Sequence, residues 1–269
     1  MGRLAEMFRD RAEAGEGALM PFITGGYPSV EITGALIESL GAAGADAIEI
    51  GIPFSDPIAD GPVIAESMHE ALQMGATPSG IFEVVSGLRS KLQVPLIAMV
   101  SISIVHRLGG SAFVSEAVDA GFDGLIVPDG DLQDLTDVAD AAREKDVAFT
   151  TLVAPGSTSS RIRAITELAN EFIYLLTRRG LTGERSDAPD LAGSVASIRT
   201  SSSLPIAAGF GISTPQHVVA ALKEADGAIV GSALVRAVGE AHSGGNDPSE
   251  TAGKLIAPLA EAAHTAGAT

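Results

Sequence analysis

Cysteine is absent from the 269-residue sequence, which excludes disulfides, thiolate nucleophiles and cysteine-ligated metals. The five histidines lie outside motifs such as HExxH, so no metal centre is indicated. The sequence also lacks a GxSxG nucleophile elbow, a Walker loop and a full dinucleotide fingerprint. These absences argue against hydride transfer and ATP chemistry.

Positive charge is scarce: 17 Lys and Arg residues stand against 34 Asp and Glu residues, giving a net charge of −17. No Lys/Arg cluster suited to a phosphate backbone is present, so a nucleic-acid partner is not expected. We interpret the acidic balance as a solvated surface.

Long hydrophobic runs are also missing, because no stretch of about 18 apolar residues is free of charge. The N-terminal segment "MGRLAEMFRDRAEAGEG" alternates apolar and charged residues like a surface helix and lacks the apolar centre of a signal peptide. We therefore expect a soluble, cytoplasmic protein that does not enter a membrane.

Short apolar runs rich in β-formers recur along the chain, each followed by a helical pattern. Continuous apolar runs are typical of parallel strands covered on both faces. The eight runs predict an α/β fold, a single-domain (β/α)8 TIM barrel over residues 1–269 with an extra N-terminal helix. A doubly wound sheet is the alternative. The runs span residues 18–24, 46–51, 95–100, 124–128, 147–153, 172–177, 204–209 and 227–231.

Two connections after strands are long, from Gly51 to about Ser79 and from Arg178 to about Pro189. In both candidate folds, function lies at the C-terminal strand ends, where long loops usually serve as lids or binding elements. We expect the second connection to be mobile without ligand. Elsewhere, "GAAGAD" and "EAVDAGFDG" read as one helix-to-strand joint used twice.

Glu49 lies within the apolar run that ends at Gly51. Since successive strand residues alternate faces, Ile48 and Ile50 would face the helices and Glu49 the barrel mouth. A partly desolvated carboxyl has a raised pKa and can exchange protons near neutral pH. The alternative is an ion pair with a basic residue inside the barrel.

Asp60 follows Glu49 in a turn-rich loop that can fold back over the strand end. Two carboxyl groups in one site can divide roles, one titrating and one staying ionised. Equally, Asp60 could cap a helix that opens near Pro62.

The segments "GFGIS" (209–213) and "GSALV" (231–235) follow the last two strands, each with a glycine at the strand end and a serine opening a helix. Barrels often bind a phosphate at these two loops, through backbone amides. The pair predicts a phosphate site, although each segment alone reads as an ordinary helix start.

Five segments together resemble the alpha subunit family of tryptophan synthase, in the family's order across nearly the whole chain. They are "PFITGGYPS", "IEIGIPFSDPIADGP", "YLLTRRGLTG", "AAGFGIST" and "AIVGSALV". The resemblance implies a lyase of tryptophan biosynthesis that cleaves indole-3-glycerol phosphate to indole and glyceraldehyde 3-phosphate without a cofactor. It makes Glu49 the general acid/base at the indole ring carbon, and Asp60 the carboxylate at the indole N–H.

The resemblance also implies substrate- and phosphate-binding positions. Tyr174 would stand beside the reacting centre, and Thr182 and Gly183 would belong to the lid. The remaining positions are Phe210, Gly211, Gly231 and Ser232.

A beta subunit that carries pyridoxal phosphate is the implied partner, in an alpha2beta2 assembly. Pro53, Asp56 and Asp129 fall on the implied interface. The chain departs from the family pattern nearby, with Ser101 and Ser103 for Tyr and Asn, and Asp131 for Pro. Those departures keep open a stand-alone lyase that releases free indole. A non-catalytic partner of a beta subunit is a third reading, which the intact acidic pair disfavours.

Overall fold

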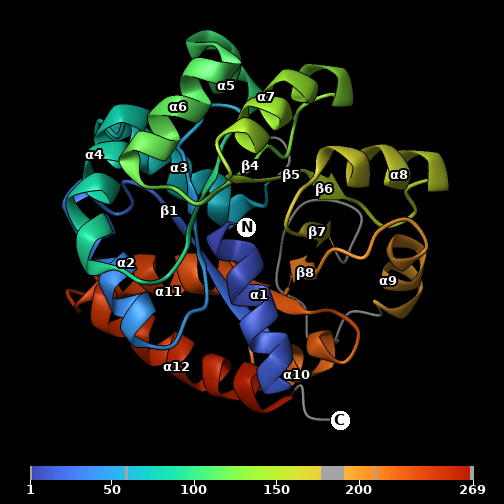
Figure 1. Ribbon diagram of the computed structural model, residues 1–269. Coiled ribbons are helices and arrows are strands. Elements are labelled where there is room, and N and C mark those ends of the chain that lie inside the picture. The colour runs from blue at the N-terminus through green and yellow to red at the C-terminus, as the bar shows by residue number, and fades with distance from the viewer. Residues whose placement is uncertain (1, 58–59, 177–190, 210, 267–269) are drawn as a thin grey trace.

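The computed structural model describes residues 2–57, 60–176, 191–209 and 211–266, and in this part of the chain nine strands form one parallel sheet (Figure 1). Their order is β5-β4-β3-β2-β1-β9-β8-β7-β6. The strands are β1 (Ala18–Thr24), β2 (Ile48–Gly51), β3 (Leu96–Met99), β4 (Gly124–Ile126), β5 (Ala148–Thr150), β6 (Leu152–Val153), β7 (Ile173–Leu176), β8 (Ile206–Gly209) and β9 (Gly227–Val230).

The predicted fold class is confirmed. Each of the eight predicted runs contains a strand, and the run 147–153 contains two, β5 and β6. These two strands stand at opposite ends of the sheet order but follow each other directly in the chain, so the sheet closes into a barrel there. The first strand pairs with both β2 and the last strand β9, which joins the two ends of the chain in one sheet.

The seam between β5 and β6 falls at Thr151, whose hydroxyl donates to the carbonyl oxygen of Val127 at 2.8 Å. Asn170 bridges the seam with its side-chain amide, which accepts from Phe149 N–H and donates to Val147 O at 3.0 Å. Its own backbone N–H donates to Phe149 O at 3.0 Å. A side chain therefore supplies hydrogen bonds that a continuous strand ladder would supply elsewhere.

Asn170→Ala is expected to lower the free energy of unfolding by roughly 2–4 kcal/mol, because it leaves two buried backbone groups without their partners. Urea denaturation should show a lower midpoint with an unchanged slope. Asn246→Ala, at an exposed position, is the matched control. Equal stability of the two variants would show that the Asn170 side chain does not stabilise the closure of the barrel.

Helices surround the barrel, as Figure 1 shows. They bury a continuous apolar cluster against its outer face. The α-helices of the described chain are α1 (Arg3–Ala14), α2 (Val30–Ala42), α3 (Pro62–Gln73), α4 (Pro78–Leu88), α5 (Ile102–Leu108), α6 (Gly110–Ala120), α7 (Leu132–Glu144), α8 (Ser159–Leu168), α9 (Ala192–Arg199), α10 (Pro215–Leu222), α11 (Ser232–Ser243) and α12 (Pro248–Ala266), with a short 3₁₀ turn at Arg89–Lys91.

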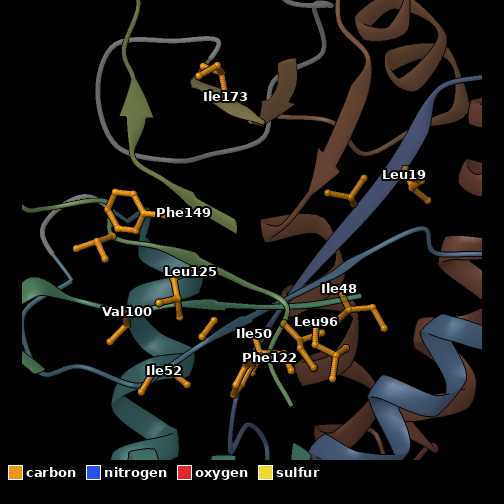
Figure 2. Packing of buried hydrophobic residues seen from close by; sticks show 14 of the residues in the cluster. Leu19, Ile48, Ile50, Ile52, Leu96, Val100, Phe122, Leu125, Phe149 and Ile173 are labelled. Carbon is orange, nitrogen blue, oxygen red and sulfur yellow. The ribbon is translucent and has the colours of Figure 1, made fainter. Parts of the chain in front are cut away.

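Successive strand residues alternate between two apolar clusters. Leu19, Ile48 and Ile50 belong to the cluster between barrel and helices, and Figure 2 shows them beside their strands. Phe22 and Ile97 belong to a second cluster inside the barrel. This alternation follows from the two-residue period of a strand and gives every inward position a definite neighbour on the next strand.

Helix α1 closes the N-terminal end of the barrel. Its buried side chains Leu4 and Phe8 join the inner cluster, where the Phe8 ring lies 5.9 Å from that of Phe172. Glycines make room for them at the first residues of two strands: a Cβ atom would lie 2.7 Å from Leu4 at Gly124 and 3.2 Å from Phe8 at Gly227. The other end of the barrel, where the strands finish, is left for the loops.

An aspartate recurs at the joints that lead into β2, β4 and β9. Each accepts a hydrogen bond of 2.6–2.9 Å from the backbone N–H at the start of a neighbouring strand and donates its own N–H to the same residue's carbonyl. The pairs are Asp46 with Leu19, Asp123 with Leu96, and Asp226 with Ile206. The sequence indicated the first two joints, and the structure adds the third.

Candidate active site

Glu49 lies in β2 in register with the inward-facing residues Phe22 of β1 and Ile97 of β3. It is 0% exposed, and neither carboxyl oxygen receives a hydrogen bond within the described part of the chain. The alternative of an ion pair therefore finds no support among these residues. Burial raises the pKa of Glu49 well above its ordinary value. Burial therefore favours the protonated form of this carboxyl group, the form that can act as an acid.

Asp60 lies in the loop between β2 and α3, with its backbone N–H donating to Pro57 O at 3.0 Å. The N-cap of α3 is Gly61, and no side chain caps this helix. The cap alternative for Asp60 is therefore wrong, and its carboxyl group lines a pocket at the barrel mouth. Burial, and after it the negative charge of Asp129, raise the pKa of Asp60 to about 6.

The long connection predicted between Gly51 and Ser79 is largely helical. Helix α3 occupies residues 62–73 of it, and α4 begins at Pro78. A proline at the first position of each helix fits the backbone there, since the missing N–H would have no partner in any case. The predicted connection thus shortens to the loop before α3, which carries Asp60.

Tyr174 lies close enough to both carboxyl groups to be influenced by their charges. It lies on β7 in register with Leu152 and Ala207, and it is 8% exposed. Its pKa is raised well above the ordinary value by burial first, and then by the charges of Glu49 and Asp60. A Cβ atom at residue 209 would lie 2.5 Å from the hydroxyl oxygen, so the tyrosine needs Gly209 beside it. The phenol stays neutral and closes one wall of the site.

The far end of the pocket is made of backbone. Gly211 has a left-handed φ of +70°, which favours glycine. Gly231 precedes the 12-residue helix α11, which begins at Ser232. The first N–H groups of a helix have no partner within it and attract anions. Gly211, Gly231 and Ser232, which the sequence placed at a phosphate site, line one pocket.

Between these two ends the pocket is apolar, and none of its described lining residues carries a positive charge. A negatively charged ligand would therefore rely on backbone N–H groups. The sequence had not singled out the apolar walls, although inward alternation along β1, β3 and β9 could have found three of them. The additional lining residues are Phe22, Ile64, Met99, Pro128, Leu152, Leu176, Ile212, Ile229 and Ala233.

A second pocket lies on the other side of Asp60, which lines both. Asp56 and Asp129 line this second pocket together with Ser101. Pro53 lines a third pocket, which shares Phe54 with the second. The residues predicted for a partner interface therefore surround the outer side of the Asp60 loop.

Three predicted site residues cannot be placed. Thr182, Gly183 and Phe210 lie outside the described residues, as does the connection 178–189. The described residues contain no group of three His, Cys, Asp or Glu side chains that could hold a metal ion. No helix in the same part of the chain is long and apolar enough to cross a membrane.

The sequence and the fold both have close counterparts. Residues 8–264 match a protein-family model described as tryptophan synthase alpha chain. The sequence is 44% identical over 242 residues to the tryptophan synthase alpha chain of Halorhodospira halophila, covering 89% of each chain. It is 40% identical over 245 residues to that of Pelobacter propionicus, covering 91% of each.

Solved structures agree. Tryptophan synthase from Mycobacterium tuberculosis superimposes with a TM-score of 0.89 at 31% identity, covering 98% of each chain. Tryptophan synthase subunit alpha from Legionella pneumophila gives a TM-score of 0.87 at 31% identity, covering 97% of this chain and 98% of the other.

Proposed function

The chain belongs to the tryptophan synthase alpha chain family, and we propose that Glu49 and Asp60 carry out its reaction. The protein is a lyase of tryptophan biosynthesis that cleaves indole-3-glycerol phosphate. The family needs no cofactor for this step, and pyridoxal phosphate belongs to the beta subunit. One observation supports the assignment most: Asp60 lines an apolar pocket that ends at the first N–H groups of a helix, and the buried Glu49 lies behind the lining residue Phe22, its register neighbour.

The first step we propose is proton transfer from Glu49 to the indole ring carbon that bears the side chain. The raised pKa of Glu49 keeps this proton available near neutral pH. The carboxyl group is fully covered, so it reaches a bound molecule by rotating its side chain toward the pocket. Protonation places a positive charge on the ring, spread to the nitrogen.

Asp60 stabilises this cation. An ionised carboxylate near the indole nitrogen accepts its N–H and lowers the energy of the charged ring, and a partly desolvated site strengthens that attraction. The carboxylate left on Glu49 then takes the proton of the side-chain hydroxyl. The carbon–carbon bond breaks, its electrons restore the indole ring, and glyceraldehyde 3-phosphate leaves with a new carbonyl. Glu49 ends the cycle protonated, as it began.

The pocket holds the substrate through its phosphate. Gly211, Gly231 and Ser232 supply the N–H-rich end, and Tyr174 packs beside the reacting centre. We assign Thr182, Gly183 and Phe210 to the same site by their positions in the family pattern. Backbone donors suit a protein whose net charge is −17, because the dianion needs no basic side chain here.

We infer association with a tryptophan synthase beta subunit in an alpha2beta2 assembly, with Pro53, Asp56 and Asp129 at the interface. The similarity to tryptophan synthase structures supports this partner. We further propose that residues 1–269 form one domain, because β1 and β9 pair although they lie near opposite ends of the chain. A cytoplasmic location is consistent with a biosynthetic enzyme.

Purified protein is expected to release indole from indole-3-glycerol phosphate, and to do so faster with its cognate beta subunit. Indole release and its conversion are followed by spectrophotometry with and without the partner. Substantial turnover alone and no gain on adding the beta subunit would indicate a stand-alone lyase. Absence of turnover under both conditions would contradict the proposed function.

A further inference from the structure

Asp129 is held in a fixed orientation at the end of β4. Its Oδ2 accepts from the hydroxyl of Ser101 at 2.7 Å, and its Oδ1 accepts from the backbone N–H of Ile102 at 2.9 Å. Both donors come from the segment that follows β3. Two hydrogen bonds to separate oxygens fix both the position and the rotation of a carboxylate.

Ser101 is itself fixed. It is 6% exposed, and its hydroxyl oxygen accepts from the backbone N–H of Ser103 at 3.2 Å as the N-cap of α5. The hydroxyl therefore accepts one hydrogen bond and donates another, which leaves little freedom to either group. Local sequence gives Ser101 only a capping role, and the bond to Asp129 links the loops that follow the neighbouring strands β3 and β4.

Asp129 and Asp60 line one pocket, on the outer side of the Asp60 loop. The titratable groups that line the two pockets around Asp60 are Asp56, Asp129 and Tyr174, with Glu49 behind them. Among the described residues, no lysine, arginine or histidine lines either pocket. Nothing in this set offsets the negative charge of Asp129 at Asp60, and after burial that charge is the cause that raises the pKa of Asp60.

We propose that Asp129 is a positioning residue that sets how readily Asp60 takes up a proton, and that Ser101 holds it in the place where it does so. The proposal rests on the proposed role of Asp60 in catalysis. Asp129 touches neither the reacting atoms nor the phosphate end, so its effect runs through the charge state of Asp60. Burial comes first and this neighbour adds to it, so Asp60 next to Asp129 takes up a proton at a higher pH than it would without that charge.

Carbon-13 NMR of the aspartate carboxyl carbons tests this in the full chain without substrate. The Asp60 signal is identified by its loss in Asp60→Asn. In Asp129→Asn the titration midpoint of Asp60 is expected to fall by roughly one pH unit, because a neighbouring negative charge has been removed. An unchanged midpoint would overturn the proposal.

Ser101→Ala tests whether the serine hydroxyl holds Asp129 in place. It also tests the proposal if Asp129→Asn folds poorly. Without the hydroxyl, Asp129 can turn toward solvent, so the Asp60 midpoint should move in the same direction by a smaller amount. Asp134→Asn removes the same charge from an exposed position in the first turn of α7 and should leave the midpoint in place. A shift in this control equal to that in Asp129→Asn would contradict a local effect.

The pH dependence of kcat/KM forms the second arm of the test. In Asp129→Asn its acid limb should move down with the Asp60 midpoint. A midpoint that moves while the acid limb stays would support the influence of Asp129 on Asp60 and count against the catalytic role of Asp60. The two ideas therefore fail separately.

Discussion

Glu49→Gln is expected to lower kcat for cleavage of indole-3-glycerol phosphate by about 10²–10⁴-fold, because glutamine cannot deliver a proton to the ring carbon. Binding should change little. Glu49 lies inside the barrel behind residues that line the pocket, and the phosphate site that we propose belongs to the loops after β8 and β9. Steady-state kinetics and titration with a phosphate-bearing substrate analogue separate the two effects.

The same substitution should stabilise the fold at alkaline pH. The pKa of Glu49 is raised in the folded state, so the folded protein retains a proton that the unfolded chain releases. That contribution to stability is complete below the unfolded pKa and is lost as pH rises through the folded pKa. The gain in Tm of Glu49→Gln over the wild type should therefore grow with pH. Glu38→Gln, at an exposed position, should show no such trend.

A variant Glu49→Gln with wild-type kcat would remove Glu49 from the mechanism. A Tm difference that stays constant from acidic to alkaline pH would show instead that the carboxyl group is solvated in solution. Either result is informative without the other, because the first tests the chemistry and the second tests the burial on which the pKa depends.

Asp60→Asn is expected to lower kcat/KM by about 10²–10³-fold, the cost of losing one electrostatic partner of a transition-state charge. In the wild type, kcat/KM should fall as pH drops through about 6, since a protonated Asp60 cannot stabilise the ring cation. The fall should approach tenfold per pH unit, and Asp60→Asn should lose this limb. Kinetics between mildly acidic and neutral pH provide the measurement, and a limb that persists in the variant would assign it to another group.

The placement of Glu49 could be predicted because strand geometry is rigid. Once "DAIEIG" is read as a strand, alternation fixes which side chains face inward, and the fold class follows from the repeated strand and helix pattern. The position of the two glycines that line the pocket, Gly211 and Gly231, could be predicted in the same way, since they occur where strands give way to helices, and their role in binding a phosphate stays a prediction.

The role of Asp60 could not be decided locally, because an aspartate before Gly-Pro reads equally well as a cap and as a site residue. Only the three-dimensional arrangement shows that Gly61 occupies the cap position. Asn170, outside the run 147–153, hydrogen-bonds to Phe149 within it, and the contact of Ser101 with Asp129 joins two separate loops. Such contacts have no signature in a single sequence.

The seam at Thr151 divides the chain in a way that matters for the evolution of this protein. In the proposed mechanism the three carboxyl groups Glu49, Asp60 and Asp129 precede the seam, whereas Gly211 and Gly231, proposed to hold the phosphate, follow it. The carboxyl groups and these glycines are thus encoded in consecutive stretches of the polypeptide. Mutation or recombination in the gene can change one stretch and leave the other as it is. The protein can then bind a substrate with a different group in place of the phosphate while the carboxyl groups stay unchanged.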